Sequence, residues 1–111
     1  MEYRIVLRVK VRENSWIRIG EEHRILWEIR GLIEASSGCT MLNQVGIGSA
    51  ASLVPLFEKG IWELTQSANS YLSYEALCGM GTIRDTLEFY RNLLKDCKGH
   101  PYAELYGEVV A

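Results

Sequence analysis

The sequence is poor in the residues from which metal centres and disulfide frameworks are built. Its 111 residues include only two histidines and three cysteines, and the cysteines are too widely spaced for a Cys-x-x-Cys pair. A zinc site would need ligands scattered along the chain, and an odd number of cysteines cannot all pair internally. We therefore expect no metal and no cofactor, and we expect Cys39, Cys78 and Cys97 to be free thiols, as in a reducing compartment.

An excess of positive charge is also missing. The chain carries 12 Lys and Arg against 14 Asp and Glu, which gives a net charge of -2. Non-specific binding to nucleic acid depends on a surplus of cations, so we expect no nucleic-acid partner. No apolar run approaches the length of a membrane span, and the chain opens on a strand pattern with no export signal before it. The sequence therefore predicts a cytoplasmic protein with no membrane partner.

The clearest pattern that is present covers residues 3–12. Apolar side chains alternate there with cationic ones, and only Val6 breaks the alternation. Successive side chains of a strand point to opposite faces, so the pattern predicts a strand with one face in a core and one cationic face. The apolar positions are Tyr3, Ile5, Leu7, Val9 and Val11, and the cationic positions are Arg4, Arg8, Lys10 and Arg12.

Residues 102–110 are predicted to form the last strand, with two acids, Glu104 and Glu108, on one face. Opposite charges on neighbouring strands stabilise a sheet by about 0.2–1 kcal/mol per pair. The cations of the first strand need such partners. We therefore expect the first and last strands to be adjacent, with Arg8 or Lys10 facing Glu104 or Glu108.

Three helices are predicted between these strands. Residues 21–36 carry apolar side chains at helical spacing, with Glu21 and Glu22 in the first turn. A second helix over 53–66 would follow Ser52 as its cap, with Pro55 in the first turn. The third, over 83–97, would open at a capping box formed by Thr82 and Asp85 and end at Lys98-Gly99.

The remaining strands have weaker signals. Residues 16–19 follow a turn and are predicted to return as a short second strand, and residues 40–45 are predicted to form a third. Residues 70–77 alternate weakly; they are predicted to form a strand, although the same residues could extend the helix before them.

These elements predict a single α+β domain over residues 1–111. We expect a mostly antiparallel sheet covered on one face by two to three helices. The order β-α-β-(α)-β-α-β would suit a ferredoxin-like arrangement with an inserted helix, in which the first and last strands are neighbours.

One stretch resembles a phosphate-binding loop. Gly46 to Ala51 fits the pattern G-x-G-x-x-A between a predicted strand and a predicted helix, where glycines would let backbone N–H groups approach a phosphate. A full dinucleotide-binding domain needs a longer chain than this one. A small enzyme or ligand-binding subunit that uses Gly46–Ala51 for a phosphate-containing ligand is therefore the alternative function.

The function that the sequence favours is binding to another protein. No nucleophile, base and acid stand at a spacing that indicates catalysis, so we expect no enzyme and no catalytic residues. The acidic balance is typical of immunity proteins and antitoxins, toxin inhibitors that neutralise a cationic toxin or nuclease domain. The candidate partner-binding residues are unpaired surface acids around a tryptophan anchor: Glu21, Glu22, Trp27, Glu28, Glu34, Asp85 and Glu88.

Overall fold

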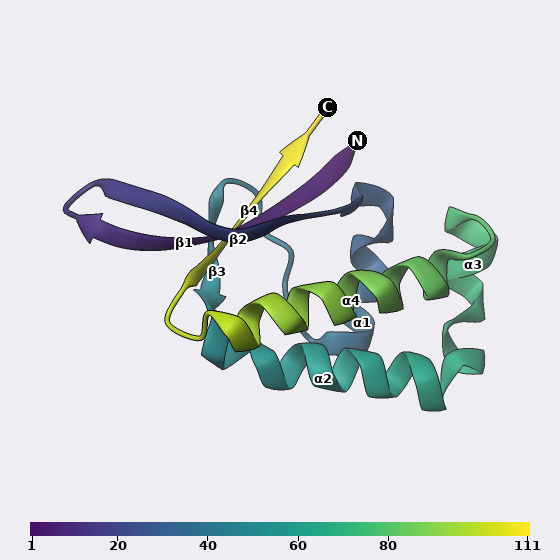
Figure 1. Ribbon diagram of the computed structural model, residues 1–111. Coiled ribbons are helices and arrows are strands. Elements are labelled where there is room, and N and C mark those ends of the chain that lie inside the picture. Colours follow the sequence, from purple (N-terminus) through teal and green to yellow (C-terminus); the bar gives the residue numbers. More distant parts are fainter.

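Strand β1 lies inside a four-stranded antiparallel sheet with the order β2-β1-β4-β3 in the computed structural model, which describes residues 1–111 (Figure 1). The predicted pairing of the first and last strands is confirmed, because Arg8 stands opposite Glu104 and Arg4 opposite Glu108. The two chain ends therefore lie close together at one end of the sheet. The strands are β1 (Glu2–Arg12), β2 (Ser15–Leu26), β3 (Val45–Ser49) and β4 (Glu104–Val110).

The helices cover one face of this sheet, as expected for the predicted α+β class (Figure 1). They are α1 (Arg30–Ser37), α2 (Ala50–Gln66), α3 (Leu72–Cys78) and α4 (Thr82–Gly99), with short 3-10 turns η1 (Trp27–Ile29) and η2 (Ala68–Tyr71). No helix combines the length and the apolar character needed to cross a bilayer.

The apolar face of β1 forms the centre of the core. Tyr3, Ile5 and Leu7 are completely buried against the helices, and each such side chain contributes roughly 1.5–3 kcal/mol before entropy is subtracted. Beyond Val9 the β1–β2 hairpin projects past the helices (Figure 1), so Val11 and Ile17 are exposed. The alternation therefore predicted the strand correctly, but the buried part of the strand is shorter than predicted.

The predicted helix over 21–36 is wrong in its first half. β2 continues to Leu26, and only Arg30–Ser37 form an α-helix. The apolar residues Ile25 and Ile29 are compatible with either period, and pairing with the whole length of β1 decides in favour of the strand. Glu21 and Glu22 consequently lie on a strand, and no helix dipole acts on them.

The order of elements also differs from the predicted one. The first two strands form a hairpin with no helix between them, and three helices follow β3 before β4. The ferredoxin-like order is therefore not adopted, although the first and last strands are neighbours as that arrangement requires.

The middle of the chain contains two further corrections. The third strand is Val45–Ser49, whereas it was expected at 40–45, and residues 70–77 belong to η2 and α3. The 70–77 segment lies against α4 and η1 and pairs with neither edge strand of the sheet. It instead packs the rings of Tyr71 and Tyr74 on the core.

The helix starts are displaced from their predicted caps. Ser49, and not Ser52, caps α2, because the Ala50 and Ala51 N–H groups donate to carbonyls near β4 and start the helix earlier. Pro55 then lies inside the helix, past its first turn. Thr82 is the first residue of α4 and caps nothing; its hydroxyl donates to the Gly79 carbonyl at 2.6 Å, so the predicted capping box is absent.

Close packing of α2 on α4 depends on a glycine. The two helices lie side by side (Figure 1), and buried Gly60 faces the ring of Tyr90. The hydroxyl of Tyr90 lies 2.7 Å from Ser36 Oγ and donates to the Ile33 carbonyl at 3.0 Å, so the ring cannot easily turn away.

We predict that Gly60→Ala destabilises the fold although alanine favours helices. The added methyl group would lie 2.6 Å from Tyr90 Cε2, and overpacking of this kind costs about 1–3 kcal/mol, more than the roughly 1 kcal/mol gained in helix propensity. Gly99→Ala, at the open end of α4, is the matched control and should be neutral or stabilising. Urea unfolding of both variants checks this; equal effects would contradict the packing argument.

Candidate partner-binding cleft

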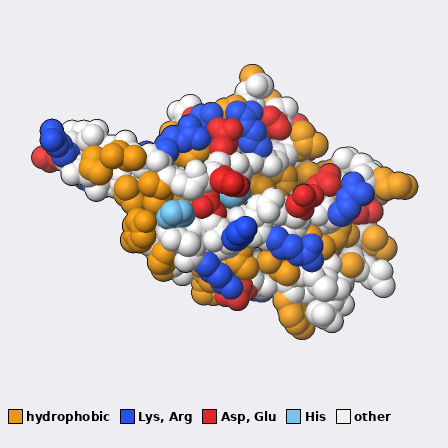
Figure 2. All heavy atoms as spheres, in the orientation of Figure 1, with side chains coloured by type: hydrophobic (Ala, Val, Ile, Leu, Met, Phe, Trp, Pro, Cys, Tyr) orange, Lys and Arg blue, Asp and Glu red, His pale blue; other side chains and the backbone are white.

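A cleft of about 380 Å³ separates the outer edge of β2 from α4. Buried Ile25, Ile29 and Phe89 contribute its apolar part. Figure 2 shows acidic side chains over these two elements, with Lys and Arg side chains among them. The polar and charged lining consists of Glu2, Glu21, Glu22, His23, Arg24, Asp85, Glu88 and Asn92.

The cleft is strongly acidic for a chain of nearly balanced charge. Its lining holds five carboxylates and one arginine, although the whole chain has 14 acidic and 12 basic residues. Glu21 and Glu88 have no cation within 4.0 Å and take part in no ion pair. These two acids are the ones free to attract a positively charged partner.

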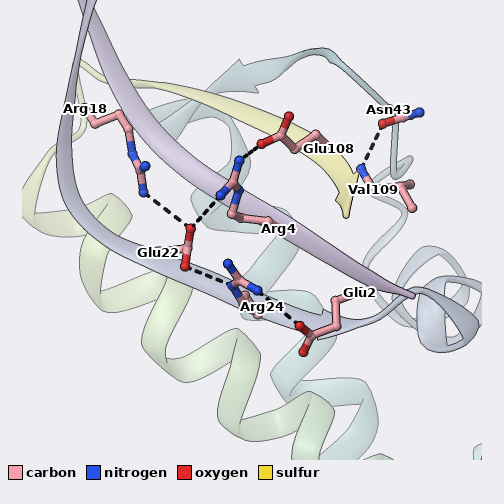
Figure 3. A network of polar contacts seen from close by, with 8 residues as sticks. All are labelled: Glu2, Arg4, Arg18, Glu22, Arg24, Asn43, Glu108 and Val109. Atoms are coloured by element: carbon pink, nitrogen blue, oxygen red, sulfur yellow. Dashed lines mark hydrogen bonds and ion pairs between the residues drawn. The ribbon is translucent and has the colours of Figure 1, made fainter. Parts of the chain in front are cut away.

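Glu22 is held by its own chain. Its carboxylate lies 3.1 Å from Arg4, 3.5 Å from Arg18 and 2.9 Å from Arg24 (Figure 3). The hydrogen bond from Arg24, with smaller contributions from Arg4, lowers the pKa of Glu22. Arg24 continues the network to Glu2 at 3.2 Å. The prediction that Glu22 is an unpaired surface acid is therefore wrong, and it serves to position the β2 edge.

The same network ties β2 to β4 across β1. Arg4 also pairs with Glu108, and beside it the Val109 N–H donates to Asn43 Oδ1 at 2.8 Å (Figure 3). These contacts lie on the uncovered face of the sheet, where an ion pair is screened by water and stabilises little by itself. Their effect is to fix which residues face one another.

A bulge in β2 shapes the end of the cleft. The register shifts between Val6 and Leu7 of β1, which leaves Gly20 and Glu21 of β2 unmatched. The left-handed Gly20, with φ of 68°, packs on the carboxylate of Asp96 in α4. Gly20 is the one signal of this bulge in the sequence, because an isolated glycine within a strand often marks a bulge.

Asp96 joins the bulge to the helix. Its Oδ2 accepts the Glu21 N–H at 2.9 Å and lies 2.8 Å from His23 Nε2, while His100 Nε2 lies 3.6 Å from Oδ1. His23 is buried on β2, within the segment that was predicted to be a helix over 21–36. The fold brings both histidines of the chain to one carboxylate, although they lie far apart in the sequence.

We predict that Asp96→Ala loosens the β2 edge. It leaves the buried His23 side chain without its acceptor, which costs about 1–3 kcal/mol, and it also removes the acceptor of the exposed Glu21 N–H. Glu88→Ala, on the same helix but without a hydrogen bond of this kind, is the control and should be nearly neutral. Chemical denaturation measures both, and an unchanged Asp96→Ala midpoint would contradict this role.

The remaining predicted binding residues lie outside the cleft. Trp27 stacks on Tyr3 with ring centroids 5.2 Å apart and is covered by Arg30. Glu28 lies 3.7 Å from the N-terminal amine, and Glu34 accepts the Met41 N–H at 3.1 Å. The fold thus brings together Glu21, Glu22, Asp85 and Glu88 and separates them from Trp27, Glu28 and Glu34. Leu26, 47% exposed at the cleft rim, is the exposed apolar residue beside the acids.

The glycine stretch Gly46–Ala51 does not form an open loop. Gly46 and Gly48 are paired with β4. The first three N–H groups of α2 donate internally: Ala50 to the Ala103 carbonyl, Ala51 to the Pro101 carbonyl and Ser52 to Ser49 Oγ. A phosphate at this helix start would find these donors already engaged.

Two of the three cysteines have thiols of low reactivity. Burial raises the pKa of Cys39 to about 11 and of Cys97 to about 12, so both stay protonated near neutral pH. All three thiols are free, as the sequence predicted, and Cys78 is the most accessible of them.

We predict that a thiol reagent at neutral pH modifies Cys78 quickly and Cys39 and Cys97 slowly, since only the thiolate reacts and these two are buried. Denatured chain without reductant should show three thiols. Cys78→Ser should remove the fast phase; a fast phase that survives in this variant would contradict the assignment.

Comparison with known proteins gives no further guide. No known protein family, no curated protein and no solved structure matches this chain.

Proposed function

We propose that this chain is a non-enzymatic protein-binding module of the immunity or antitoxin type, which neutralises a cationic toxin or nuclease domain. One observation carries the proposal: five acidic residues line a single cleft, and Glu21 and Glu88 among them have no cationic partner in the chain. A cytoplasmic location, with which three free thiols agree, belongs to the same proposal.

The geometry supports recognition of a basic partner. Unpaired rim carboxylates attract cations over a distance of about 8–10 Å at ordinary salt and mainly raise the association rate. Contact with the apolar part of the cleft, including exposed Leu26, would then lengthen the life of the complex. Trp27 does not line this cleft; its ring stacks on Tyr3 and lies under Arg30.

The alternative, a small enzyme or ligand-binding subunit that takes a phosphate-containing ligand at Gly46–Ala51, has less support. The N–H groups that would bind phosphate there are engaged. The buried thiols of Cys39 and Cys97 are poor nucleophiles.

The test begins with capture of the partner from the source cell by the wild-type chain, followed by kinetics with the purified partner. We predict that Glu21→Lys with Glu88→Lys slows association about tenfold or more, and that salt reduces the wild-type rate toward that of the variant. The melting temperature should change little, since neither carboxylate has a cationic partner to lose.

The matched control is Glu13→Lys with Glu58→Lys, which changes the net charge equally at exposed positions outside the cleft. It should leave most of the association rate intact. Equal loss in both double variants would show a net-charge effect only, and an unchanged rate in the cleft variant would refute the proposed site.

A further inference from the structure

The outer edge of β2 has unpaired backbone groups. β2 ends the sheet on this side, and β1 pairs with its other edge. In an antiparallel pair, residues that exchange hydrogen bonds alternate with residues whose N–H and C=O point away from the partner strand. The Trp27 N–H donates to the Met1 carbonyl, and in the register of β1 and β2 this places Ile25 and His23 among the bonded residues. The N–H and C=O groups of Glu22, Arg24 and Leu26 therefore point outward.

This open edge forms one wall of the acidic cleft. Glu22, Arg24 and Leu26 all line it, and α4 supplies the opposite wall with Asp85, Glu88 and Phe89. A chain lying in the cleft would thus meet backbone donors and acceptors on one side and carboxylates on the other. An exposed row of this kind is a template for an added strand.

The acidic charge of the cleft determines which kind of chain can add to the β2 edge. A second copy of this protein, paired edge to edge through β2, would bring a second set of Glu21, Asp85 and Glu88 toward the first, and like charges facing each other oppose association. A segment with a cation at every second residue places its positive side chains toward α4, because side chains of a strand alternate between the two faces of a sheet.

We propose that the partner contributes an extended basic segment that pairs with β2 at Glu22, Arg24 and Leu26 as a fifth strand. This inference rests on the proposed function and adds the conformation in which the partner binds. The residues of the segment that face α4 are Lys or Arg. The residues between them lie on the outer face of the sheet beside Arg24 and Glu2, where uncharged side chains leave the existing ion pairs undisturbed.

Leu26 offers a substitution that tests the strand pairing directly. Its φ of -61° and ψ of 133° suit proline, and its N–H points away from β1, so Leu26→Pro removes an outward donor without removing a β1–β2 bond. Leu26→Ala is the control, since it removes the same side chain and keeps the N–H. Circular dichroism and the melting temperature establish that both variants are folded.

The probe is a synthetic peptide of alternating lysine and threonine, long enough to pair with Glu22–Leu26. We expect it to bind the wild-type chain, to bind Leu26→Pro about tenfold more weakly than Leu26→Ala, and to bind the Glu21→Lys, Glu88→Lys variant weakly.

Two methylated forms of the peptide keep the test independent of protein stability. One carries N-methyl groups on its lysine amides and the other on its threonine amides, so each blocks hydrogen bonding along one edge only. We expect one form to lose about tenfold in affinity and the other to bind like the unmodified peptide, and the form that fails identifies the direction of the added strand. Equal affinities of the two forms would overturn the strand pairing.

The remaining outcomes are also decisive. Absence of peptide binding overturns the added strand and leaves the proposed function to its own test with the captured partner. Binding that responds to Glu21→Lys and Glu88→Lys but not to methylation supports the acidic cleft and refutes the strand.

Discussion

Pairing of β1 on both of its edges is the constraint on which the rest of the structure depends. β1 takes β2 on one side and β4 on the other, and Arg4 is bonded to Glu22 and Glu108 across both junctions. This arrangement sets the register and leaves β2 at the edge of the sheet. The open edge and the cleft beside it follow from the position of β1.

The parts of the fold that the sequence predicted are those with a strong local signal. Alternation in residues 3–12 and the complementary acids Glu104 and Glu108 were sufficient to predict the pairing of β1 with β4. Residues 21–26 could not be assigned in this way, because their apolar spacing fits two periods and the choice depends on contact with a distant strand. Residues 70–77 were misassigned for a related reason: whether a weak alternation becomes a strand depends on which distant element lies beside it, and here that element is α4.

Some of the residues that line the cleft were predicted from the sequence. Four of the predicted acids, Glu21, Glu22, Asp85 and Glu88, line it, although the sequence placed the first two on a helix. Its shape depends on the Gly20–Glu21 bulge and on Asp96, which joins His23 and His100. The residues on β2 are far in the chain from Asp96 and His100, and the two groups come together only on folding. Glu22 shows that a count of charges does not identify unpaired acids, because its ion pairs with three arginines form only in the folded chain.

Amide hydrogen exchange, resolved by residue in the free chain and in the complex with its captured partner, is the most direct test of the β2–α4 cleft as the binding site. We expect the N–H groups of Glu22, Arg24 and Leu26 to exchange rapidly in the free chain and to become protected in the complex. The far end of α2 and α3 offers a competing exposed apolar surface, at Trp62, Leu72 and Leu77. Protection confined to that end, with exchange at the β2 edge unchanged, would show that the partner does not bind in the β2–α4 cleft.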